Sequence, residues 1–295
     1  MSIHPPEGQH LHPSFILIGP PKSGSTSLWY SLSAHPRVAV RENIYCKEPS
    51  FFWRDDLYAR GIESYLRNFP KDDGSGRITF ECTQNYFSSP DAYRRIHEAY
   101  PDMKLIVVLR DPVARAYSLY THLHMDALIL RKLREEPGYG ERILARYPEL
   151  AGGGYLPDPN DERYNGEPAS FEEIAEEYLG GRCSRHWALD YLGMSEYVRH
   201  IERWTALFSR QQMLFVCAEE LFGDYQGVLR LIQEFAGLRP CELPYHRDNQ
   251  GELRAKAAGV PYAPPPRSLV EKLREHFAPL NRELFAFLGR TYPWG

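Results

Sequence analysis

The residues with the clearest chemical signature run from Gly19 to Thr26 and read GPPKSGST. They follow a short apolar run at 14–19 and precede a segment, 25–34, with apolar residues at helical spacing. A strand that ends in glycine and continues through a tight loop into a helix is a common anion site, because unpaired backbone N–H groups and the helix dipole converge there. The sequence therefore predicts a site for a phosphate-like group at this loop.

The lysine of this loop does not stand where nucleoside triphosphate-binding loops carry it. Their GxxxxGK[ST] pattern places lysine directly after the second glycine. Here Ser25 follows Gly24, and the lysine is Lys22, inside the loop. The earlier position of the lysine favours an anion shorter than a triphosphate, with the lysine near the oxygen that bridges to a leaving group. Two alternatives stay open on these residues alone: a P-loop small-molecule kinase that uses Mg-ATP, which the apolar run and acid at 105–111 support, and a Gly-Pro turn with an incidental lysine.

The elements that would position this loop alternate between strand and helix patterns. Short apolar runs predict strands at 14–19, 77–81, 104–110 and 212–217. Helical patterns cover 25–34, 89–100, 113–133, 171–179, 195–208 and 224–236, with one broken helix at 268–288. This alternation predicts an α/β fold: a P-loop-type central parallel sheet flanked by helices on both faces.

We expect a single domain over residues 1–295, since the length is within the range of one large domain. Residues 135–169 are rich in Gly, Pro and charge, and predict an insertion near the acceptor cleft. A polar, Pro-rich stretch follows later at 243–266, and residues 1–13 read as a flexible N-terminus.

The bulk composition excludes several partner classes. The formal net charge is −4 and the pI is about 6.3, so no global basic field attracts nucleic acid. No apolar run approaches the roughly 20 residues of a transmembrane helix. The five cysteines form no CxxC pair, which disfavours zinc or a disulfide framework. These observations predict a cytoplasmic protein, or a soluble domain lacking its membrane anchor, and leave the oligomeric state open.

Seven segments, in order along the chain, carry a resemblance to a known family. They are 15–28, 47–52, 65–70, 81–87, 109–120, 197–204 and 288–294. The sequence resembles the sulfotransferases that depend on 3′-phosphoadenosine 5′-phosphosulfate (PAPS), in the branch of the heparan sulfate N- and 3-O-sulfotransferases. The resemblance implies transfer of a sulfuryl group to a hydroxyl, less probably an amine, of a carbohydrate or glycan acceptor. The product would be 3′,5′-adenosine bisphosphate, and no metal would be needed.

The resemblance also implies a set of donor-binding residues: Lys22, Ser23, Gly24, Ser25, Thr26, Ser27, Arg110, Ser118, Arg254 and Lys256. The first segment is similar to the family's 5′-phosphosulfate motif. Lys22 would be the cation at the bridging oxygen, where charge develops in the transition state. Arg110 and Ser118 resemble the family's pair on the 3′-phosphate. Independently, Arg110 leaves the C-terminal end of a strand, where ligands bind in open α/β sheets, and Ser118 lies about two helical turns onward.

Two parts of the chain depart from the heparan sulfate branch. Arg254 and Lys256 stand where the family has a basic loop over the donor, and Gly259 is compatible with it, but the spacing differs and a late cysteine pair is missing. Where those enzymes carry a lysine after the glutamate at a strand end, this chain has Cys82. The loss of a cation argues against a highly anionic acceptor.

Two residues are candidates for the general base. By resemblance, Glu48 takes the acceptor proton, and its position before the aromatic residues 51–53 supports this. A solvated ion pair with Lys47 is the simpler alternative. His122 is the second candidate, because it lies four residues after Ser118 and can share that helix face; an ordinary, partly buried histidine is its alternative.

A non-catalytic nucleotide-binding or scaffold protein is the third class of function. The presence of both Lys22 and Glu48 disfavours it. The residues named so far leave the acceptor, the sulfated position and the choice between O- and N-sulfation open.

Overall fold

The computed structural model describes residues 8–41, 46–147, 169–182, 189–246, 250–261 and 263–294. Its strands are β1 (Pro13–Gly19), β2 (Thr79–Glu81), β3 (Lys104–Leu109) and β4 (Met213–Cys217). Its α-helices are α1 (Ser25–Ser33), α2 (Asp55–Tyr58), α3 (Ile62–Leu66), α4 (Ala92–Ala99), α5 (Pro112–Glu135), α6 (Tyr139–Arg146), α7 (Phe171–Leu179), α8 (Tyr197–Thr205), α9 (Ala218–Gly223), α10 (Tyr225–Phe235), α11 (Gln250–Ala258) and α12 (Arg267–Leu288).

The strands form one sheet in the order β2-β1-β3-β4, and every pairing is parallel. Parallel neighbours need a crossover connection, which here is helical, so both faces of the sheet become covered. The strands are accordingly almost wholly apolar: all six residues of β3 but Lys104 are buried. The predicted parallel α/β sheet is confirmed. Three of the strands are one or two residues shorter than predicted at one end, and β1 begins one residue earlier, at Pro13.

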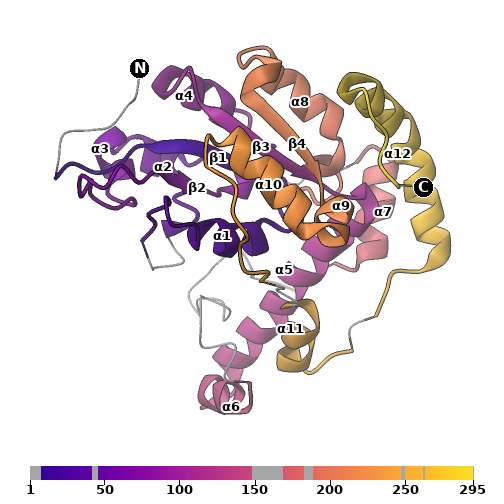
Figure 1. Cartoon of the computed structure of the whole chain (residues 1–295). Coiled ribbons are helices and arrows are strands. Elements are labelled where there is room, and N and C mark those ends of the chain that lie inside the picture. The colour runs from indigo at the N-terminus through magenta and orange to yellow at the C-terminus, as the bar shows by residue number, and fades with distance from the viewer. Residues whose placement is uncertain are drawn as a thin grey trace.

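Side chains alternate between the two faces of the sheet and build two cores. Ile16, Val107 and Phe215 lie in one core, which also holds residues of α3, α4, α8 and α12. Leu17 and Val108 lie in the other, which holds residues of α1 and α10. Figure 1 shows α1 and α10 on one side of the strands and α4 and α8 on the other.

The stretch 243–266 differs from its prediction. It contains the helix α11, which packs along α5 far from the sheet (Figure 1). Its sequence, QGELRAKAA, is rich in residues that favour helices, whereas the prolines that follow it favour a loop. The predicted break in the last helix is wrong, because α12 continues through Pro279. Within the predicted insertion, α6 is described, whereas residues 148–168 lie outside the described part.

The N-terminal segment from Gly8 is tied to the protein by backbone bonds. The Leu11 N–H donates to Pro70 O at 2.8 Å and the Gly8 N–H to Asp72 O at 3.1 Å. The side chain of Leu11 is buried. Residues 1–7 of the predicted flexible terminus lie outside the described part.

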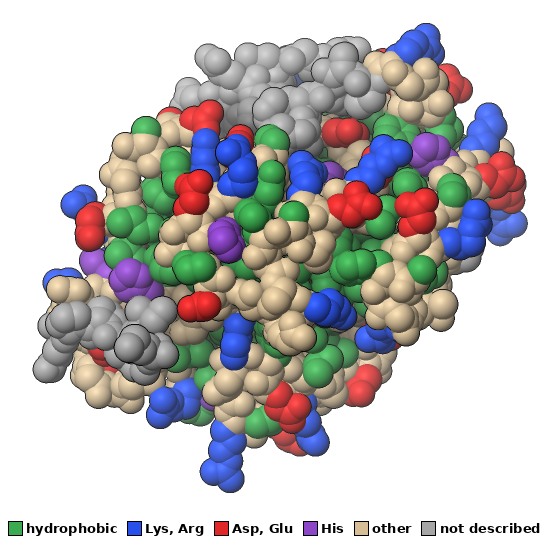
Figure 2. Space-filling view, turned by 90° about the horizontal axis from the view of Figure 1, so that it is seen from above, with side chains coloured by type: hydrophobic (Ala, Val, Ile, Leu, Met, Phe, Trp, Pro, Cys, Tyr) green, Lys and Arg blue, Asp and Glu red, His purple; other side chains and the backbone are tan. Residues whose placement is uncertain are grey.

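Charged side chains of both signs are interspersed over the face seen in Figure 2, with apolar side chains between them. This pattern agrees with the small net charge of −4. Among the helices in the described ranges, none is both long and apolar enough to cross a bilayer.

Gly19, at the end of β1, is the glycine that the fold can least replace. Its φ is +107°, and a Cβ there would stand 2.2 Å from Gln84 O. Gly19→Ala is therefore expected to destabilise the fold by about 3 kcal/mol, from left-handed strain and overpacking. Urea unfolding measures this. Gly223→Ala, where no atom lies within 4 Å of the added Cβ, is the matched control, and equal midpoints for the two variants would contradict the prediction.

Candidate active site

The loop between β1 and α1 has a shape suited to an anion. Gly24 caps α1 with φ +94°, and Lys22 also takes a left-handed conformation, φ +70°. A left-handed lysine is uncommon, and such residues concentrate at ligand sites. Ser23 is fully buried, and within the described part of the chain its hydroxyl has no hydrogen-bond partner. A buried hydroxyl without a partner is costly, so a bound group that forms a hydrogen bond with Ser23 would remove this cost.

Arg110 brings the second predicted donor motif to this loop. Its Nη1 donates to the backbone O of Lys22 at 2.9 Å. Arg115, one turn into α5, donates to Pro21 O at 3.4 Å and to Ser195 Oγ at 2.8 Å, and is fully buried. Both arginines therefore bond to backbone carbonyls of the loop and hold it in place. Sequence reasoning missed Arg115, although a charged residue among apolar helix positions was a usable signal.

Lys47 connects the loop to the predicted base. Its Nζ donates to Thr26 Oγ1 at 3.2 Å and to Glu48 Oε1 at 2.7 Å. The side chain of Lys47 is 6% exposed, whereas that of Glu48 is 42% exposed. A carboxylate that faces solvent is thus held next to the first turn of α1 by a buried cation. The Glu48–Lys47 ion pair does exist, but it is anchored on the phosphate loop rather than solvated at both ends.

Cys82 occupies a fully buried position under the start of α1. Its Sγ lies 3.7 Å from Ser25 O, and the Gln84 amide donates to Sγ at 3.1 Å. Burial raises the pKa of the Cys82 thiol to about 12. The residue is therefore neutral and provides no positive charge, in agreement with the departure noted in the sequence.

His122 lies on α5 in a strongly cationic neighbourhood. Burial lowers its pKa well below the usual value, and the charges of Lys22, Arg254 and Lys47 lower it further. Its Nδ1 is buried without a partner, and its Nε2 is 3.8 Å from Asp126. A neutral imidazole makes no ion pair at that distance. The lowered pKa leaves His122 able to accept a proton but weakens it as a base.

Arg254 reaches the same neighbourhood from α11, which corrects its predicted place in a loop. Its side chain is 6% exposed, and its guanidinium pairs with Asp126 of α5. Burial lowers the pKa of Arg254 to about 10, and its Nε has no partner. Lys256, two residues onward, is exposed on the other side of the helix, so the structure separates the two residues that the sequence placed together. Side chains two positions apart on one helix point in different directions.

The remaining predicted donor residues lie on two helices. Ser27 is buried in α1, and Ser118 is half-buried on α5. Ser25 and Thr26 form the first turn of α1, where free backbone N–H groups are expected. Arg110 bonds to the loop directly, and Lys22 and Lys47 lie close enough to His122 of α5 to lower its pKa.

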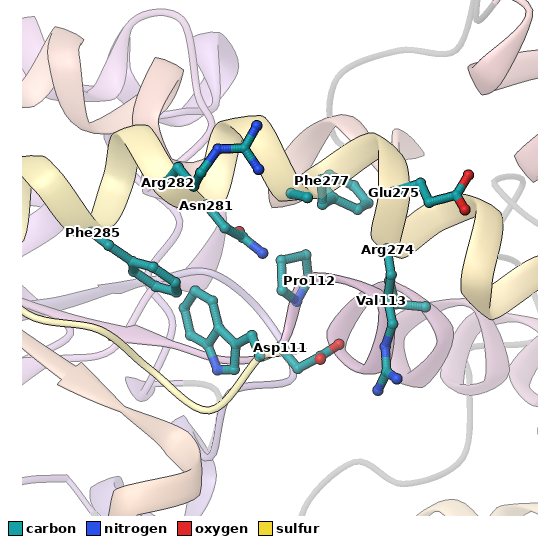
Figure 3. Close-up of a pocket in the computed structure, with 11 residues that line it drawn as sticks. Asp111, Pro112, Val113, Arg274, Glu275, Phe277, Asn281, Arg282 and Phe285 are labelled. Carbon is teal, nitrogen blue, oxygen red and sulfur yellow. The ribbon is translucent and has the colours of Figure 1, made fainter.

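A cavity of about 380 Å³ adjoins this site on the side of α12. Figure 3 shows Asn281 pointing from α12 toward Pro112, at the start of α5, and the Phe285 ring packs against Trp294. Its lining is mostly apolar and includes none of the predicted donor or base residues. The cavity therefore lies beside the contact between α12 and the start of α5, and it is distinct from the phosphate loop.

This arrangement can bind a phosphorylated donor, because a left-handed lysine and two arginines lie at the anion loop. The anchored carboxylate beside the loop can remove a proton from an acceptor. The profile of the Sulfotransferase domain family matches residues 12–248. The chain belongs to this family. It is therefore a sulfotransferase, and the kinase alternative is set aside.

Curated relatives match nearly the whole sulfotransferase chain. Human heparan sulfate glucosamine 3-O-sulfotransferase 6 is 29% identical over 304 residues, which cover 98% of this chain and 75% of the relative. The bifunctional heparan sulfate N-deacetylase/N-sulfotransferase 1 of Caenorhabditis elegans is 27% identical over 95% of this chain, but only 30% of its own length. The predicted resemblance is confirmed.

The fold has a counterpart among solved structures. A sulfotransferase from Alicyclobacillus acidocaldarius superimposes with a TM-score of 0.61 at 23% identity, covering 95% of this chain and 97% of that one. This likeness supports the α/β architecture alone.

Proposed function

We propose that this sulfotransferase moves a sulfuryl group from PAPS to a hydroxyl of a carbohydrate or glycan acceptor, with an amine as the second candidate. The observation that carries the proposal is the position of Lys47, whose Nζ bonds both Thr26 of the phosphate loop and Glu48. One buried cation thus joins the anion site to a solvent-facing carboxylate. The donor and the acceptor would meet between them.

The residues present fit a donor with phosphate groups. The buried, unpartnered Ser23 hydroxyl and the first turn of α1 face one such group. Arg110, whose guanidinium already lies against the loop at Lys22 O, would hold a second phosphate together with Ser118. Bound PAPS would supply the sulfuryl group and a phosphate leaving group.

Each residue then has a defined task in the transfer. Glu48 accepts the proton of the attacking hydroxyl, and its ion pair with Lys47 holds the carboxylate beside the loop. Lys22 stabilises the negative charge that develops on the leaving oxygen. Arg110 and Arg115 hold the loop rigid, so that this cation is in place before the reaction.

The acceptor class rests on two supports. The relatives named above act, by name, on heparan sulfate. The neutral Cys82, in place of a cation, favours an acceptor less anionic than heparan sulfate. A screen of neutral sugars, chondroitin-type and heparan-type glycans and phenols with labelled PAPS would identify the acceptor.

Ligand-induced thermal stabilisation tests the donor. Adenosine 3′,5′-bisphosphate at about 100 times its Kd should stabilise the protein by about 2.7 kcal/mol, which raises Tm by about 5 °C. The shift should be the same with EDTA as with magnesium, because the loop lysine and arginines provide the positive charge. Stabilisation by Mg-ATP alone would contradict the proposal.

A further inference from the structure

Glu81 ends β2 and is fully buried, yet the proposed reaction does not use it. Tyr65 donates a hydrogen bond to its Oε1 at 2.5 Å, and Thr83 donates one to its Oε2 at 2.7 Å. Burial raises the pKa of Glu81 to about 7, and the nearby Tyr86 side chain acts in the opposite direction. A buried carboxylate with two hydroxyl donors is costly to maintain unless its network has a role.

The partners of Glu81 lead to the segment that carries Glu48. Thr83 Oγ1 accepts the Ser50 N–H at 3.3 Å, and Tyr86 Oη accepts the Phe52 N–H at 3.4 Å. The two hydroxyls therefore each join the Glu81 network to a backbone amide within four residues after Glu48.

A third contact holds the segment on its other side. The Cys82 N–H, next to Glu81, donates to Lys47 O at 2.9 Å. Ser50 adopts a left-handed conformation, φ +58°, which a non-glycine residue adopts only when its surroundings impose it. Residues that directly follow β2 thus bond to the backbone on both sides of Glu48.

We propose that Glu81, acting through the Thr83 hydroxyl, is a positioning residue that holds the Glu48 segment in its reactive place. This inference rests on the proposed function, since it assumes that Glu48 is the base. The chemistry of the hydroxyl explains the arrangement. Thr83 has a single O–H proton, and donating it to Glu81 leaves the oxygen lone pairs directed to the Ser50 N–H.

A buried threonine on β2 itself offers a matched comparison. Thr79 is fully buried, as Thr83 almost is, and its hydroxyl has no hydrogen-bond partner among the described residues. Valine has nearly the shape of threonine and lacks the hydroxyl. Thr83→Val therefore removes the link to Ser50, whereas Thr79→Val removes a hydroxyl that bonds to no described residue.

The test measures kcat, donor KM and adenosine bisphosphate affinity for both variants. Thr83→Val should lower kcat about tenfold, the effect of one lost positioning hydrogen bond, with donor KM and bisphosphate affinity within about twofold. Thr79→Val should stay within about twofold in kcat. A kcat for Thr83→Val equal to that of Thr79→Val, with an active wild type, would overturn the positioning role alone.

A double variant separates positioning from general destabilisation. If Thr83 acts only by placing Glu48, then Thr83→Val should cost nothing more once Glu48 is Gln. A further tenfold loss in the Glu48→Gln background would show that the effect of Thr83 does not pass through Glu48. Wild-type protein that transfers nothing from PAPS would instead contradict the proposed function itself.

Discussion

Replacing Glu48 by glutamine should lower kcat by about 10²- to 10⁴-fold, the range that a general base contributes. The amide keeps the size of the side chain but cannot accept the proton of the acceptor. Donor binding should persist, because Lys47 would still donate to Thr26 of the loop. Steady-state transfer from labelled PAPS measures kcat, and calorimetry with adenosine 3′,5′-bisphosphate measures donor affinity.

The matched control for this variant is Asp56→Asn. Asp56 is an exposed carboxylate paired with Arg54 at 2.8 Å, and exposed ion pairs contribute little. Its kcat should remain that of the wild type. If Glu48→Gln also turned over normally, Glu48 would not be the base, and His122, which lies among the same cations, would be the residue to replace next.

The second large effect is expected for Lys22→Met. Removing one preorganised group that stabilises developing charge usually costs about 10²- to 10³-fold in kcat. Methionine keeps the length of the side chain, so the loss reports on the charge rather than on packing. The ground-state affinity for adenosine 3′,5′-bisphosphate should fall much less than kcat, because Arg110 and the backbone of the loop remain.

An exposed lysine of α12 provides the control. Lys272→Met removes a cation of the same type at the surface, and its transfer rate should be unchanged. A Lys22→Met enzyme that lost affinity and kcat in equal measure, or neither, would contradict a role that is specific to the transition state.

The sheet was predictable because its strands are buried on both faces. A run such as 104–109 is apolar nearly throughout, and in a chain that alternates with helices such a run has few other possible structures. The shape of the loop between β1 and α1 was predictable for a related reason. Gly19 and Gly24 occupy left-handed positions that other residues rarely adopt. The spacing of these two glycines in the sequence therefore indicates where the loop turns.

The helix α11 was not predicted, and neither was the position of Arg254. Isolated helices of this length are marginal in water, and α11 is stabilised by packing against α5, a partner more than a hundred residues earlier. The ion pair between Arg254 and Asp126 joins the two helices. Local sequence patterns carry no signal for such a contact.

The sequence by itself determined the elements of this sulfotransferase, the glycine framework of its phosphate loop and the family to which the chain belongs. Only the tertiary structure decided that Lys47, the ion-pair partner of Glu48, also donates to Thr26 of the loop, and that Arg110 and Arg115 bond to the loop. It also decided that Glu81 and Thr83 reach the Glu48 segment. The physical reason is that backbone conformation depends on near neighbours in the chain, whereas the charge and hydrogen bonding of a buried site depend on residues that only folding brings together.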